Sequence, residues 1–68
     1  MDDRLADGQK VLIIGPASEG STFMIGTETE VGRFIVNEDG KAVYLCPIHQ
    51  WGYMPFERRS LQPLGGGQ

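Results

Sequence analysis

The chain has 68 residues, one cysteine and a net charge of −3. A domain of this length buries only about 60% of the surface of its unfolded chain, so its core is shallow and leaves little room for an enclosed active site. A single cysteine excludes an intramolecular disulfide. The acidic balance opposes the approach of a phosphate backbone, which disfavours nucleic acid as a partner.

The two ends of the chain predict flexible segments. Residues 1–8 are polar and acidic and contain no apolar stretch of the kind found in a secretory signal. No apolar run approaches the ~18 residues that a membrane span requires. We therefore expect a flexible N-terminal arm over residues 1–8, a cytoplasmic location and no membrane partner. Residues 65–68 are three glycines and a glutamine, which predicts a flexible tail.

The first half of the domain predicts two β-segments separated by a loop. Residues 11–14 are apolar and three of the four are β-branched, which favours a strand. A polar loop over residues 16–22 then leads to a short turn at 23–26. The stretch 27–36 is rich in threonine and β-branched residues, and Gly32 lies inside it. Because glycine within a strand often marks a bulge or a corner, we expect the chain to bend there.

The strongest local signal is the Asn-Glu-Asp-Gly turn at residues 37–40. Asp-Gly between apolar segments is typical of a tight β-hairpin. We expect Phe34 and Val36 to pair across this turn with residues between 41 and 46. Pro47 lacks a backbone N–H and is expected to end the second strand of the hairpin.

The last third of the chain predicts a connector at residues 48–50, a strand at 51–54, a single 3₁₀ turn within 55–59 and a closing strand at 60–64. No segment has the length and apolar periodicity of an α-helix. The predicted fold class is therefore all-β, a small closed barrel of residues 9–64 with a short 3₁₀ turn before the last strand.

Four sequence features occur in a characteristic order. They are a first strand ending in Ile-Gly-Pro, a Phe-x-Ile-Gly turn, a central hairpin, and an aromatic-proline stretch followed by Ser-Leu-x-Pro-Leu. This order resembles the small Src-homology-3 (SH3)-like barrels that occur as stand-alone chains in bacteria and bacteriophages. The resemblance spans residues 9–64 and implies a five-stranded SH3-like barrel. It also implies that Leu61 and Leu64 meet Val11 or Ile13.

Members of that family commonly bind other proteins through aromatic side chains beside a loop. The residues of this chain that fit the description are Tyr44, Trp51, Tyr53, Pro55 and Phe56. Trp51 and Tyr53 are two residues apart and share one side of a strand, which is either core or, beside Phe56, an exposed patch. The chain lacks the paired tryptophans of members that hold proline-rich peptides. It also lacks the Val-Gln-Ile-Tyr strand of the plasmid-borne dihydrofolate reductases.

Cys46 and His49 have a C-x-x-H spacing that invites a zinc or nucleophile interpretation. A closed zinc site needs four nitrogen or sulfur ligands, and this chain has one cysteine and one histidine. A Cys–His dyad needs an oriented base and a substrate cleft. We expect Cys46 to pack as a small hydrophobic residue and His49 to lie in a loop, with no metal and no cofactor.

The leading hypothesis is a non-enzymatic protein-interaction module, of phage or mobile-element origin, that holds a protein partner through the aromatic patch. The alternative is a homo-oligomeric or virion-structural subunit in which the same patch meets its own copy. A third, weaker hypothesis is nucleic-acid binding through Arg33, Lys41, Arg58 and Arg59, which requires these four side chains to gather on one side.

Overall fold

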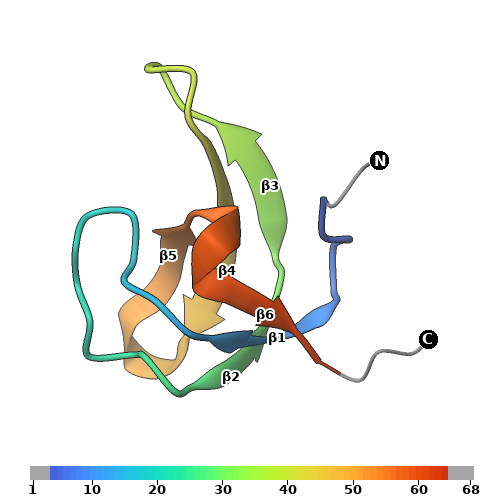
Figure 1. The fold of residues 1–68 in the computed structure, drawn as a ribbon, viewed down its shortest axis with the longest axis vertical. Coiled ribbons are helices and arrows are strands. Elements are labelled where there is room, and N and C mark those ends of the chain that lie inside the picture. The colour runs from blue at the N-terminus through green and yellow to red at the C-terminus, as the bar shows by residue number, and fades with distance from the viewer. Residues whose placement is uncertain (1–3, 65–68) are drawn as a thin grey trace.

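The computed structural model describes residues 4–64, and this part of the chain contains six strands, two 3₁₀ turns and no α-helix (Figure 1). The strands form two three-stranded antiparallel sheets, in the orders β2-β1-β6 and β3-β4-β5. The elements are β1 (Lys10–Ile13), β2 (Glu28–Glu30), β3 (Arg33–Val36), β4 (Ala42–Ile48), η1 (His49–Trp51), β5 (Gly52–Phe56), η2 (Arg58–Ser60) and β6 (Leu61–Pro63). The all-β class is confirmed, but the strands lie in two sheets rather than in one closed barrel.

The first sheet brings the two ends of the domain together. Its central strand β1 turns Val11 and Ile13 into the core, where both side chains have no exposed surface. Leu61 of the closing strand lies opposite Ile13, as the resemblance implied. The Leu64 N–H then donates to the Lys10 carbonyl at 2.9 Å. The 3₁₀ turn η2 immediately precedes this closing strand, although the sequence placed the turn within residues 55–59.

The stretch 27–36 changes from one sheet to the other at Gly32. Its first part is β2 and its second part is β3, so the expected bend is a corner between the two sheets. The Gly32 N–H donates to the Leu45 carbonyl at 2.8 Å. A Cβ atom at Gly32 would lie 2.5 Å from Cε2 of Tyr53 and 2.9 Å from the Leu45 oxygen. Glycine is required here because backbone and ring approach each other too closely for a side chain.

The predicted hairpin is confirmed, and it extends away from the rest of the domain (Figure 1). Phe34 lies opposite Tyr44, and Val36 lies opposite Ala42. The Asn37 Oδ1 atom closes the turn by accepting the N–H groups of Asp39 and Lys41 at 2.9 and 3.0 Å. Asparagine at the first position of a turn commonly makes such bonds, which hold the turn backbone from within.

The prediction that Pro47 ends a strand is wrong, because β4 continues to Ile48. The Pro55 carbonyl accepts a hydrogen bond from the Ser18 N–H and therefore points away from β4. The pair Leu45–Pro55 therefore has no mutual hydrogen bonds. Because backbone direction alternates along a strand, the pair Pro47–Tyr53, two residues further on, has none either. The nitrogen of Pro47 points toward the β3 side of β4. Strand β3 begins at Arg33, opposite Leu45, so no residue of β3 lies opposite Pro47. No ladder bond is lost there, so proline is tolerated.

The core lies between the two sheets and includes part of the predicted N-terminal arm. Leu5 is 4% exposed, and its N–H donates to the Tyr44 hydroxyl at 3.1 Å. The Gly8 N–H donates to the Val31 carbonyl at 2.6 Å. The expectation of a flexible arm thus differs from the packing seen at residues 4–8, because one leucine suffices to anchor the segment. Residues 1–3 and the expected tail at 65–68 lie outside the described residues.

Candidate functional site

The five predicted partner-binding residues separate into core and surface. Tyr44 is 3% exposed and Phe56 is fully buried, and the two lie opposite each other in β4 and β5. Their assignment to a surface patch is wrong, because both side chains point into the space between the sheets. Trp51 and Tyr53 are 66% and 63% exposed, and Pro55 is half-buried. The surface interpretation therefore holds for Trp51 and Tyr53.

Trp51 packs against Phe23, an aromatic residue that was not expected to belong to the aromatic patch. Its ring centroid lies 5.1 Å from that of Phe23, with an angle of 53° between the ring planes. Phe23 is 56% exposed and belongs to the long loop between β1 and β2, which projects to one side of the domain (Figure 1). We call Phe23 and Trp51 the aromatic pair. Phe23 belongs to the Phe-x-Ile-Gly turn noted in the sequence, but nothing there linked it to Trp51, which lies far away along the chain.

The turn between β4 and β5 positions Trp51. It is the 3₁₀ turn η1, which begins at His49 with φ +35° and is followed by Gly52 with φ +78°. The Gly52 N–H donates to the His49 carbonyl and closes the turn. A positive φ is unusual for histidine and readily adopted by glycine. The turn thereby reverses the chain within four residues and presents the indole at the end of the hairpin formed by β4 and β5.

The second sheet has an almost uncharged outer face. Tyr44, Cys46 and Phe56 belong to the core, so the residues that alternate with them point outward. From the register of the three strands, the outward residues are Arg33, Ile35, Val43, Leu45, Pro47, Tyr53 and Pro55, of which Val43 is nevertheless buried. Arg33 is the one charged residue among these seven.

A hollow of about 400 Å³ lies on this face at the sheet corner. Its lining residues are Gly32, Arg33, Leu45 and Tyr53, and we call it the Tyr53 hollow. Leu45 is half-buried, whereas Arg33 and Tyr53 are exposed. Within residues 4–64, Arg33 makes no ion pair, in contrast to Lys10, Lys41 and Arg59. Trp51 and Tyr53 are two residues apart, so their Cα atoms are within about 7.6 Å of each other. The aromatic pair and the Tyr53 hollow are therefore joined by a short stretch of backbone.

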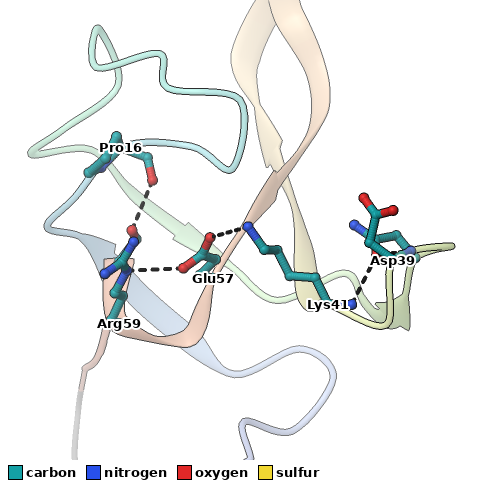
Figure 2. A network of polar contacts seen from close by, with 7 residues as sticks. Pro16, Asp39, Lys41, Glu57 and Arg59 are labelled. Atoms are coloured by element: carbon teal, nitrogen blue, oxygen red, sulfur yellow. Dashed lines mark hydrogen bonds and ion pairs between the residues drawn. The ribbon is translucent and has the colours of Figure 1, made fainter.

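The basic residues near η2 are held by one carboxylate (Figure 2). Glu57 lies 3.1 Å from Nζ of Lys41 and 3.0 Å from Nε of Arg59. The hydrogen bond from Lys41, supported by the charge of Arg59, holds the pKa of Glu57 below its ordinary value of 4.5. Arg58 donates to the Leu61 carbonyl at 2.9 Å. Each of these three cations thus has a partner within the fold.

Arg33 does not join this group. It lies opposite Leu45, which is four residues along β4 from Lys41, a separation of about 13 Å in an extended strand. The four cations of the nucleic-acid hypothesis are therefore divided, with three around Glu57 and η2 and one at the Tyr53 hollow. This arrangement weakens that hypothesis because a phosphate backbone is held by several unpaired cations acting together.

Cys46 is part of the core and not of a site. Its side chain has no exposed surface, and burial raises the pKa of the thiol to about 11 against a smaller opposite effect of a backbone hydrogen bond with Gly32. A neutral, inaccessible thiol is neither a nucleophile nor a metal ligand. His49 is exposed on η1. Across the described range, no cluster of three or more histidine, cysteine or acidic side chains could hold a metal ion.

Glu28 and Glu30 are both exposed on β2. Glu30 lies 3.4 Å from Nζ of Lys10 across the strand pair, and both side chains are largely exposed. They line an open depression of about 600 Å³ together with Lys10, Thr29, Pro47 and Leu64. Solvated pairs of this kind contribute little to stability or to binding.

Comparison with known proteins gives no relative. No protein-family model matches the chain, and neither the curated proteins nor the solved structures contain a match. Among residues 4–64, no helix has both the length and the apolar character needed to cross a membrane.

Proposed function

We propose that this chain is a non-enzymatic module that binds a partner protein through the aromatic pair. The observation that carries the proposal is the position of Phe23 and Trp51. They pack against each other with tilted rings at the surface, 56% and 66% exposed, in a domain whose core is filled by other side chains. Removal of apolar surface from water is worth about 25 cal/mol per Å², so two exposed rings are a source of binding free energy.

The composition and position of the pair fit a protein contact. Tryptophan and tyrosine are enriched among the residues that dominate interface energetics, and they lie near the centre of the contact. Phe23 already limits the rotation of the Trp51 ring, so less side-chain entropy is lost when a partner covers it. Beside the pair, Tyr53 and the outer face of β4 offer further uncharged surface.

The proposed fold relationship is to the SH3-like barrels, as an open variant with its strands divided between two sheets. Three features support it. The chain changes sheets at a glycine corner, a 3₁₀ turn precedes the last strand, and that strand pairs with the first strand. The long loop between β1 and β2 lies beside β5, where the Ser18 N–H donates to the Pro55 carbonyl at 2.8 Å.

The test is a pull-down with the tagged full-length chain from an extract of the cells in which the protein naturally occurs, followed by mass spectrometry. We expect one protein or a small set of proteins to be enriched by the wild type. The Trp51→Ala and Phe23→Ala variants should each reduce that enrichment about tenfold or more, since truncation of a central aromatic residue typically removes 2 kcal/mol or more. Both side chains are exposed, so both variants should keep the wild-type melting temperature within a few degrees.

Val36→Ala is the matched control. Val36 is 58% exposed on β3, and its loss also removes apolar surface, but it is not part of the aromatic pair. It should capture the same proteins as the wild type. Equal capture by wild type, Trp51→Ala and Phe23→Ala would show that the pair is not the contact surface.

A further inference from the structure

We infer that the Tyr53 hollow receives an acidic peptide segment of the partner, with an apolar side chain in the hollow and an adjacent aspartate or glutamate paired with Arg33. This inference rests on the proposed function and specifies the chemistry of the partner. It starts from Arg33, the one charged residue among the outward-facing residues of the three strands, which makes no ion pair within residues 4–64.

Charge complementarity decides the acidic part. Within residues 4–64, Lys10, Lys41 and Arg59 each have a carboxylate partner, whereas Arg33 has none. A guanidinium that projects from an uncharged surface forms two parallel hydrogen bonds with a carboxylate. Its interaction with the carboxylate becomes stronger when the partner excludes water from the surrounding apolar face. The Tyr53 hydroxyl is a second donor at the same hollow.

The shape of the hollow decides the apolar part. Its volume of about 400 Å³ falls at the small end of the range of ligand pockets, which fits a single large side chain. Leu45 and the backbone of Gly32 lie between Arg33 and the Tyr53 ring. The absence of a side chain at Gly32 lets the ring of Tyr53 pack against the backbone there, so the ring forms one wall of the hollow.

The remaining charge of the molecule adds selectivity. The chain has a net charge of −3, so an acidic partner is repelled at long range everywhere except near an unpaired cation. A segment with one or two carboxylates beside an apolar residue pairs with Arg33 and is only weakly repelled by the rest of the chain. A highly acidic segment is repelled more strongly. Binding should therefore weaken with salt, but with the shallow dependence of a single ion pair.

The test is selection of random dodecapeptides displayed on phage against the full-length chain, followed by fluorescence polarisation with the enriched peptides. We expect enrichment of aspartate or glutamate next to leucine, isoleucine, phenylalanine or tryptophan. Arg33→Gln should weaken the selected peptides about five- to tenfold, as does the loss of one charge-assisted pair. Tyr53→Ala should weaken them by at least as much, because it removes one wall of the hollow.

Arg59→Gln is the matched control, because it makes the same chemical change at an exposed cation that is paired with Glu57. It should leave the affinity within twofold of the wild type. Enrichment of basic or uncharged peptides, no enrichment at all, or equal affinity of wild type and Arg33→Gln would each overturn the inference. Peptides that depend on Trp51 and not on Arg33 would overturn it while supporting the proposed function. Peptides that depend on Arg33, together with a pull-down unaffected by Trp51→Ala, would do the opposite.

Discussion

Cys46 combines complete burial with a titratable group. Its side chain has no exposed surface, and burial raises the pKa of the thiol from 9.0 to about 11. The folded state therefore holds the proton more tightly than the unfolded state does. The resulting contribution to stability is present below pH 9 and is lost as the pH rises toward 11, where the unfolded chain ionises first.

We predict that the free energy of unfolding falls more steeply between pH 9 and pH 11 in the wild type than in Cys46→Ala. The difference in slope should be at most ~1.4 kcal/mol per pH unit, which corresponds to one proton. Urea titrations at a series of pH values measure it, and the slope is compared because the alanine variant also loses packing. Parallel curves would show that the thiol ionises equally in both states. A folded thiol that reacts quickly with a disulfide reagent at pH 8 would contradict its burial.

At the same scale, sequence reasoning could place Trp51 and Tyr53 two residues apart but could not say which way they face. The outcome depends on where β5 begins and ends. Because β5 extends to Phe56, strand alternation turns Met54 and Phe56 inward and Tyr53 outward. The sequence assigned Phe56 to a 3₁₀ turn, where that alternation does not apply. The stacking of Phe23 on Trp51 joins a loop to a turn, and no local pattern encodes such a contact.

At the scale of elements, the local signals were the reliable ones. The Asp-Gly turn fixed the hairpin and the pairing of Phe34 and Val36, because turn type sets register. The bend at Gly32 was also predicted from the sequence, but the division of the strands into two sheets at this bend was not. Pro47 misled because its effect depends on which edge of the strand its nitrogen faces. That direction is a property of the neighbouring strands and not of the proline itself.

The polar network around Glu57 ties distant elements together (Figure 2). Glu57 pairs with Lys41 at the turn end of the hairpin formed by β3 and β4 and with Arg59 in η2. In the same turn, the Ser60 N–H donates to the Glu57 carbonyl, and the Ser60 hydroxyl donates to the Pro16 carbonyl at 2.8 Å. Glu57 thus links the hairpin to η2, the turn before the last strand. Ser60 links the same turn to the long loop between β1 and β2.

We predict that Glu57→Gln lowers the stability slightly at neutral pH and low salt and has a smaller effect at pH 3. The pKa of Glu57 is lowered in the folded state by the hydrogen bond from Lys41 and by the charge of Arg59. Its stabilising effect is therefore present above pH 4.5 and is lost as the pH falls through the folded-state pKa. Urea midpoints between pH 3 and pH 7 measure the effect, and 1 M salt should reduce it. Glu38→Gln, an exposed change in the hairpin turn, is the control. Equal midpoint shifts for the two variants would show that the pairing contributes nothing.

At the scale of the whole molecule, the aromatic pair raises the question of whether the partner is a second copy of the chain. Two aromatic side chains bury about 150–250 Å² each, whereas a stable interface covers about 800 Å² on each partner. The accessible surface of this chain is 4511 Å², so such an interface would need more than a sixth of it. An isologous contact must also bring each surface against itself, and in this chain that would place Arg33 near its own copy.

We therefore predict that the purified chain is a monomer of 7.5 kDa by size-exclusion chromatography with light scattering at 10 to 100 μM protein. Like charges on the two copies oppose self-association, because an isologous contact would place Arg33 near its own copy, and the net charge of −3 adds to this at low salt. The control is the same measurement at 0.5 M salt, which screens the repulsion and should still give a monomer. Twice this mass in the wild type, restored to a single chain by Trp51→Ala, would show that the aromatic pair binds its own copy. The module would then be an assembly subunit in place of a receptor for another protein.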